Sequence, residues 1–199
     1  MKKTYLLLCI TILALTACQP ELKDSSQYQV DITRTQFGVP HIKAADYGSL
    51  GYGEAYASGQ DQVCNMAVAL ITAKGEAAQY LGVGHENAYL YSDMVIGALN
   101  MPFKGRKALA VQPEKIKKWI EGYTAGYNRY LRDSAGEYDS WCNHASWVKP
   151  ATAEDFMTQY VASVHTITRM AGAIVAAGRP ADRFSESYKK HYAGKHRNE

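Results

Sequence analysis

The stretch of sequence that decides the fold runs from Asp31 to Met66 and reads DITRTQFGVPHIKAADYGSLGYGEAYASGQDQVCNM. Its first part is rich in β-branched residues and turns at Phe37-Gly38, which predicts strands over 29–35 and 39–43 joined in a hairpin. Its second part has apolar residues at helical spacing and follows Asp46, whose side chain can cap the first turn of a helix. The stretch therefore predicts a β-hairpin followed directly by a long helix.

Three glycines, Gly51, Gly53 and Gly59, lie inside this predicted helix. Each costs about 1 kcal/mol relative to alanine in a helix interior. Glycine is retained at such positions where another backbone comes very close, because it has no Cβ. We therefore expect a close approach along this helix.

The long helix is expected to reach about Leu81, with one break, and to end at the glycine pair of 82–84. A phosphate-binding loop is rejected there, because the glycines follow a helix rather than a strand. The next segment, 85–102, is aromatic and has no clear period, so we predict that it is irregular.

Two further helices are predicted, joined by a polar loop. The first has Pro113 in its first turn and ends near Asp133, and its apolar stripe is more typical of a core than of a cofactor site. The second follows Thr152 and Asp155, which resemble a capping box, and continues toward Ala177. The stripe of the first helix is Ile116, Trp119, Ile120, Tyr123, Tyr127 and Tyr130, and the second is predicted to turn Phe156, Tyr160, Val161, Val164 and Ile167 inward.

The length and charge of the chain limit its class. Its 199 residues, 47% of them hydrophobic and 21% charged, are ordinary for a globular protein of one or at most two domains. The formal charge of +3 includes Lys2 and Lys3, and without those two, 20 basic residues face 19 acidic ones. This balance gives no electrostatic reason to expect a nucleic acid partner. We predict one domain over 30–180 and a polar, disordered tail over 181–199.

The N-terminus reads as an export signal. Lys2 and Lys3 precede an apolar run, Tyr5–Leu15, that is too short to span a bilayer. The run ends in Leu-Thr-Ala before Cys18, which looks like a bacterial lipoprotein box. We therefore predict a signal peptide over 1–17, a lipidated Cys18 and a tether over 18–29, with a plain secretory peptide as the alternative. Gln19 favours the outer membrane of a Gram-negative bacterium, on its periplasmic side.

The cysteines follow from that prediction. Cys9 belongs to the discarded segment and Cys18 to the anchor, which leaves Cys64 and Cys142. In an oxidising compartment two cysteines most simply form one disulfide. Two buried free thiols remain an alternative, and a two-cysteine metal site is disfavoured because only His144 lies near either cysteine in sequence.

No residue pattern in the chain specifies a nucleophile. Ser58, Ser92 and Ser163 all lack the Gly-x-Ser-x-Gly context. A serine nucleophile needs a base within hydrogen-bond reach. Ser163 and His165 lie two residues apart on a predicted helix, so they face different directions.

Other titratable residues are also best explained by structure. The six histidines show no metal spacing, and we interpret His41 and His165 as structural. Glu54 and Asp61 lie seven residues apart on one helix face, where they form either paired carboxylates or a polar contact between helices. The residues alone therefore give no convincing active site.

Several short motifs resemble the penicillin acylase family of N-terminal-nucleophile hydrolases, in particular its branch of acyl-homoserine lactone and aculeacin acylases. The similarity extends from about Asp31 to Met170. The matching motifs are Arg34, Gly38-Val39-Pro40-His41-Ile42, Gly51-Tyr52-Gly53, Tyr56-Ala57, Gln60-Asp61, Lys74-Gly75-Glu76, Tyr80-Leu81-Gly82, Ser92-Asp93, Trp141-Cys142 and Trp147-Val148-Lys149-Pro150.

The resemblance implies a fold class and a missing partner. The fold would be α+β and mostly helical: the α-subunit part of an αββα hydrolase, with an N-terminal hairpin followed by long helices. The family precursor is cut into this small subunit and a larger β-subunit whose N-terminal serine is the nucleophile. The freed α-amine takes the serine's proton, so no histidine is needed. The resemblance also supports pairing Cys64 with Cys142 and assigns the glycines to a close backbone approach within an α/β-subunit heterodimer.

The resemblance also points to residues near the substrate. The segment Thr166–Met170 (TITRM) is similar to the family's pocket-lining segment. Thr166, Arg169 as a gate or polar anchor, and Met170 as an adaptable apolar wall are the substrate-binding candidates, with ordinary helix packing as the alternative. No catalytic residue, metal site or cofactor is expected in this chain.

Together these features predict an exported, lipid-anchored α-subunit, or a truncated precursor, of an amide-hydrolysing acylase. Its substrates would be N-acyl compounds such as acyl-homoserine lactones or penicillin-like amides, and the chain alone would be inactive. The rival hypothesis is a stand-alone exported lipoprotein that acts as a binding or structural module without catalysis.

Overall fold

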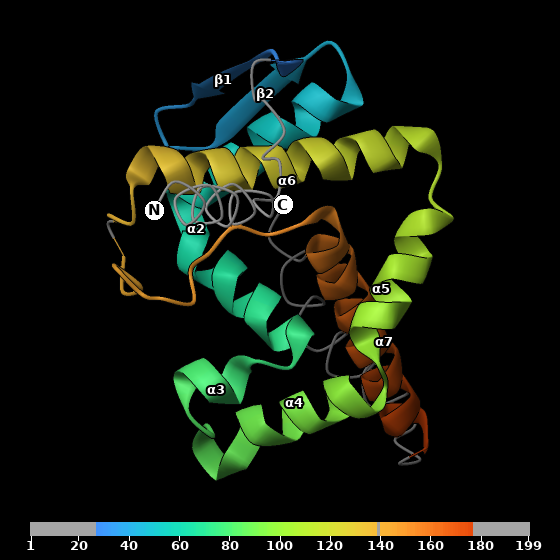
Figure 1. The fold of residues 1–199 in the computed structure, drawn as a ribbon. Coiled ribbons are helices and arrows are strands. Elements are labelled where there is room, and N and C mark those ends of the chain that lie inside the picture. The colour runs from blue at the N-terminus through green and yellow to red at the C-terminus, as the bar shows by residue number, and fades with distance from the viewer. Residues whose placement is uncertain (1–26, 139, 177–199) are drawn as a thin grey trace, which may run out of the picture.

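The computed structural model describes residues 27–138 and 140–176, with side chains through residue 166. Two strands are followed by helices (Figure 1). The leader 1–17, Cys18, most of the tether and the tail 181–199 lie outside the described residues. In chain order the elements are β1 Val30–Arg34, β2 Pro40–Ala44, α2 Tyr47–Lys74, α3 Ala77–Leu81, η3 His85–Asn87, α4 Ala88–Ala98, α5 Met101–Ala110, α6 Glu114–Ser134 and α7 Ala153–Ala176.

The predicted hairpin is confirmed. β1 and β2 pair antiparallel with Ile32 opposite Ile42, and the turn between them contains Gly38 with a φ of 79°. The hairpin packs on α2 at Gly53, where an added Cβ would lie 2.5 Å from Val30 Cγ2 and 2.8 Å from Ile42 Cγ2. The absence of a side chain at Gly53 therefore lets the hairpin rest directly on the helix.

The most extensive contact between elements is the crossing of α2 and α6, which Figure 1 shows next to the hairpin. A Cβ built on Gly51 would overlap the carbonyl oxygen of Trp119. Conversely, a Cβ on Gly122 would overlap the carbonyl oxygen of Gly48, and a Cβ on Gly126 would overlap the carbonyl oxygen of Tyr52. The two backbones are in contact through glycines on both helices. The expected close approach is therefore confirmed, and it lies between two helices of this chain.

The core lies around α2, α6 and the loop that joins α6 to α7. Tyr127 is fully buried, and Trp147 from the loop packs in the same cluster. Cys64 and Cys142 are bonded, with Sγ atoms 2.06 Å and Cα atoms 5.5 Å apart, and both are buried. The disulfide thus fastens the loop to the middle of α2, which is the pairing that the resemblance implied.

The long first helix is interrupted twice rather than once. Gln62 has non-helical angles (φ −154°, ψ 37°), which kinks α2. α2 then ends at Lys74, because Gly75 takes a left-handed conformation (φ 73°) and the amides of Gly75 and Glu76 bond back to Thr72 and Ile71. The short helix α3 follows, with its first amides bonded to the Asp93 carboxylate at 3.1 and 2.7 Å.

The prediction of an irregular segment over 85–102 is wrong, because α4 and the start of α5 lie there. α4 is apolar on most sides, so its sequence has no amphipathic period. Its helix is stabilised by tertiary contacts instead: Ile96 and Met101 are buried with Ala73 and Ala162. α5 in turn packs closely along α7, with Gly105 against Thr158 (Figure 1).

The third predicted helix is confirmed, but its inward face is partly wrong. Thr152 and Asp155 form the reciprocal cap: the Thr152 amide donates to Asp155 Oδ2 at 2.8 Å, and the Asp155 amide donates to Thr152 Oγ1 at 3.2 Å. Tyr160 is 62% exposed and Val164 45% exposed, since α7 turns toward α5 instead. Among the described side chains of α7, those of Met157, Thr158 and Ala162 are buried. The side chain of Ile167 lies outside the described set.

Two smaller points complete the helices. Pro113 caps α6 immediately before its first residue, Glu114, rather than lying in its first turn. The core reading of the α6 stripe is confirmed most clearly at Tyr127, whose ring meets Phe156 edge to face at 5.5 Å.

Within the described residues, no helix has the length and apolar character needed to cross a bilayer.

The close contact between α2 and α6 can be tested by adding one methyl group to α6. Gly122→Ala forces the α6 backbone away from the Gly48 carbonyl, so we expect the free energy of unfolding to fall by about 2 kcal/mol or more. The control is Gly97→Ala on α4, where a Cβ meets nothing within 4 Å. That variant should leave stability unchanged or raise it by up to about 1 kcal/mol. Urea unfolding measures both, and equal effects of the two substitutions would contradict the crossing.

Candidate functional site

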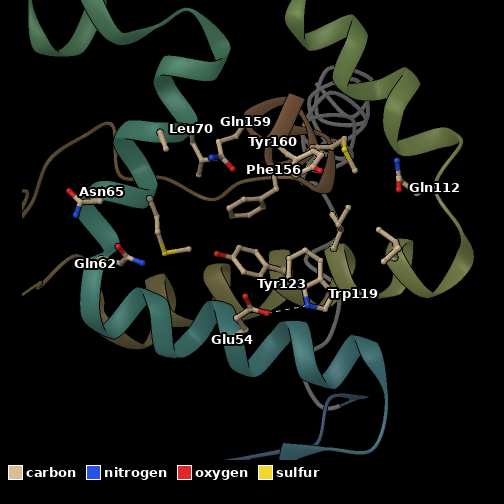
Figure 2. Close-up of a pocket in the computed structure, with 15 residues that line it drawn as sticks. Glu54, Gln62, Asn65, Leu70, Gln112, Trp119, Tyr123, Phe156, Gln159 and Tyr160 are labelled. Carbon is tan, nitrogen blue, oxygen red and sulfur yellow. Dashed lines mark hydrogen bonds between the residues drawn. The ribbon is translucent and has the colours of Figure 1, made fainter. Parts of the chain in front are cut away.

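A groove of about 550 Å³ opens between α2, α6 and α7. Figure 2 shows its aromatic row, with Phe156 of α7 above Tyr123 and Trp119 of α6. The ring centroids of Trp119 and Tyr123 lie 5.1 Å apart, and those of Tyr123 and Phe156 lie 5.0 Å apart, edge to face. Such geometries are favourable for aromatic pairs, so the row is a rigid apolar surface.

One carboxylate lies beside this row. Glu54 of α2 accepts a hydrogen bond from Trp119 Nε1 at 3.2 Å, drawn as a dashed line in Figure 2. The pKa of the Tyr123 hydroxyl is raised, first by burial and then by the negative charge of Glu54, although a hydrogen bond with Ser58 lowers it. The carboxylate therefore acts electrostatically on the aromatic row as well as holding Trp119 in place.

Amide side chains lie at both ends of the groove. Gln62 and Asn65 lie at one end, where α2 is kinked, and Gln112 lies at the other (Figure 2). Met66 and Leu70 of α2 supply apolar wall between them. An apolar body with a few polar groups around it is the usual composition of a small-molecule site.

The two carboxylates that the sequence placed on one face are not paired. Glu54 turns to Trp119, whereas Asp61 forms an ion pair with Arg34 at 2.9 Å. Arg34 also donates to the Gly38 carbonyl at 2.7 Å and to Gln60 Oε1 at 3.0 Å. Glu54 therefore ties α2 to α6, and Asp61 ties α2 to the hairpin.

The serine and histidine candidates remain separate. Ser163 Oγ donates to the Gln159 carbonyl at 2.9 Å, a contact within its own helix. His41 lies in β2 on the exposed face of the hairpin. Among the residues with described side chains, no serine hydroxyl is bonded to a histidine, and no group of three His, Cys, Asp or Glu could hold a metal ion.

The substrate-binding candidates from the resemblance lie farther along α7 than the groove. Thr166 is exposed, and its Oγ1 donates to the Ala162 carbonyl at 2.9 Å. Arg169 and Met170 belong to the same helix, but their side chains are outside the described set. Tyr160 is the last groove residue on α7 and lies six residues before Thr166, about 9 Å along the helix axis. Thr166 is not among the residues that line the groove.

Motifs that are distant in sequence meet at a second polar cluster. Lys74 and Glu76 lie 3.4 Å apart, Lys74 and Asp155 3.8 Å, and Lys149 and Glu76 3.6 Å. Lys149 Nζ also donates to the Tyr80 hydroxyl at 3.0 Å, and this bond raises the pKa of Lys149. The Lys-Gly-Glu motif and the segment 147–150 therefore connect the end of α2 to α3 and to the start of α7, which is a structural role.

The hairpin, the long helices after it and the short motifs that hold them define the class of protein. The chain matches the Penicillin amidase family over residues 29–185, and it belongs to that family. A solved structure of penicillin G acylase from Alcaligenes faecalis has the same fold, with a TM-score of 0.60 and 24% identity, and the match covers 81% of this chain and 90% of that chain.

Relatives with similar sequences include two acylases. The acyl-homoserine lactone acylase PvdQ of Pseudomonas fluorescens is 35% identical over 158 residues, which cover 77% of this chain and 20% of the relative. Aculeacin-A acylase of Actinoplanes utahensis is 31% identical over 137 residues, which cover 64% of this chain and 17% of the relative. The chain therefore spans about one fifth of the length of the relatives it matches.

The electrostatic link between Glu54 and the aromatic row predicts a titration. Glu54→Gln removes the negative charge that raises the pKa of Tyr123, so that pKa should fall, yet stay above its ordinary value because burial remains. NMR titration of labelled tyrosine measures it. Glu114→Gln on the exposed start of α6 is the control and should leave the Tyr123 pKa unchanged. An unchanged pKa in Glu54→Gln would contradict the link.

Proposed function

We propose that this chain is the smaller, N-terminal part of an exported acylase that hydrolyses the amide bond of N-acyl compounds, such as acyl-homoserine lactones or penicillin-like amides. One observation carries the proposal: the family match extends over residues 29–185, and the match to an acylase relative covers 20% of that relative. The solved acylase chain with the same fold is almost fully covered by this one, which supports a separate small subunit.

The proposal divides the chemistry between two polypeptides. A larger β-subunit supplies an N-terminal serine, whose own α-amine takes the hydroxyl proton. The serine oxygen attacks the amide carbonyl, the amine leaves, and water then releases the acid from the acyl-enzyme. The serines whose side chains the structure describes have no histidine partner, which agrees with a nucleophile supplied from elsewhere.

The role of this chain would be to bind and shape. We assign Thr166, Arg169 and Met170 of α7 to the wall of the acyl pocket, on the strength of the family resemblance. Exposed apolar side chains on α4 support a partner that covers this part of the molecule, because such patches mark interaction sites. They are Leu90, Tyr91, Met94 and Val95.

Activity measurements separate this proposal from catalysis by the chain alone. The purified chain should not hydrolyse N-dodecanoyl homoserine lactone. Coexpression with a downstream reading frame, in phase or shifted by one base, that encodes a Gly-Ser junction should restore hydrolysis. Turnover by the chain alone that is lost on changing a single serine of this chain would overturn the proposal.

We also propose that the protein is exported and anchored through a lipid on Cys18. A buried disulfide between Cys64 and Cys142 suits an oxidising compartment outside the cytoplasm. Cys18→Ser should move the protein from the membrane fraction to the soluble fraction and abolish labelling with palmitate. If Cys18→Ser fractionates as the original chain does, and the original chain is not labelled with palmitate, a plain secretory peptide is favoured instead.

A stand-alone lipoprotein that binds a ligand without catalysis is the second candidate, because the groove is a formed site within one chain. It predicts a monodisperse monomer that unfolds cooperatively. The acylase proposal predicts a chain that associates through its exposed apolar surface until its partner is present. Sedimentation of the purified chain, with and without the coexpressed polypeptide, distinguishes the two.

A further inference from the structure

Among the residues whose side chains the structure describes, no cationic group forms an ion pair with the Glu54 carboxylate. Its Oε2 atom accepts the hydrogen bond from Trp119 Nε1. None of the residues that line the groove is a lysine, arginine or histidine. A carboxylate accepts several hydrogen bonds, so Oε1 is available to a group bound in the groove.

The aromatic row also attracts positive charge. The faces of tryptophan, tyrosine and phenylalanine rings attract cations, tryptophan most strongly. Trp119 has this ring beside the carboxylate, and Tyr123 and Phe156 continue the row across the groove. A carboxylate next to such rings favours an organic cation over a neutral or anionic group.

The dimensions of the groove favour a small ligand. Its volume of about 550 Å³ lies within the usual range for small-molecule sites. A group of exposed apolar side chains that suits a protein partner is on α4, at the other end of α2 from the hairpin (Figure 1). Gln62 and Asn65 supply hydrogen-bonding groups at the end of the groove near the kink.

We propose that the groove between α2, α6 and α7 binds a small organic cation, an ammonium or guanidinium group carried on an aromatic or short alkyl body. The cation contacts Glu54 and the face of Trp119, and the apolar body lies along Tyr123 and Phe156 toward Leu70. Thr166 is not among the residues that line this groove, and the proposal does not depend on the acylase function.

Three probes of one shape test the charge preference on the purified, disulfide-bonded full chain. They are phenethylamine, phenethyl alcohol and 3-phenylpropionate, and calorimetry or ligand-observed NMR gives their affinities. We expect the amine to bind about tenfold more tightly than the alcohol, from one partly screened ion pair and the ring contact. The anion should bind most weakly.

Glu54→Gln isolates the cause of the preference. Glutamine keeps an acceptor for Trp119 Nε1 and removes only the charge, so the near-ultraviolet circular dichroism of the tryptophans should be retained. The affinity for phenethylamine should fall to that for phenethyl alcohol. Glu114→Gln, which removes an exposed carboxylate from the same helix as Trp119 but outside the groove, should leave all three affinities unchanged.

The remaining outcomes overturn the proposal. Equal affinity for the amine and the alcohol in the original chain would show that Glu54 does not select charge. A preference that survives in Glu54→Gln would place the cation elsewhere. Tighter binding of a blocked arginine-containing peptide than of phenethylamine would make the groove a docking place for a basic segment of a polypeptide. None of these results bears on whether the chain needs a larger subunit for hydrolysis.

Discussion

The rest of the structure depends on the contact between the backbones of α2 and α6. Gly51 on one helix and Gly122 and Gly126 on the other each face a carbonyl of the opposite helix, and a single Cβ at any of them would overlap it. Helices usually pack 8–10 Å apart because side chains interdigitate between them. Where glycine removes the side chains, the helices come closer, and residues that flank the contact are held in fixed relation to each other.

The groove is one result of that contact. Because α6 crosses α2 at the glycines, Trp119 comes within hydrogen-bond distance of Glu54, and Tyr123 faces the kinked part of α2. α7 then closes the third side, positioned by its cap at Thr152 and Asp155 and by the polar cluster around Glu76. The disulfide at Cys64 fastens the intervening loop to α2 just beyond the kink. A small set of backbone contacts and covalent ties thus determines the shape of a site built mainly from α2, α6 and α7.

The sequence predicts the parts of this fold that depend on local patterns. The hairpin, the cap at Asp46 and the cap at Thr152 are all encoded within a few residues, and the structure confirms them. The glycines of 51–59 indicate a close approach but not its partner, because Gly122 and Gly126 lie some 70 residues later and their spacing alone does not indicate which helix they meet. α4 was missed since its helix depends on tertiary contacts at Ile96. The groove was missed because Trp119, Tyr123 and Phe156 have the spacing of core residues. Only the placement of α7 shows that space remains beside them. A charged Glu54 on the glycine-rich helix was the one signal available.

The glycine contact also has a consequence for the order in which the chain can fold. The smallest piece of chain that contains both sides of the contact runs from Gly48 to Gly126. During synthesis, α2 has no surface against which to bury its glycine face until α6 has emerged, and an isolated helix with several glycines is weak. Cys64 can form its disulfide only after Cys142 has been synthesised, which happens later still. The contact between α2 and α6 can therefore form only after the chain has been synthesised as far as Gly126.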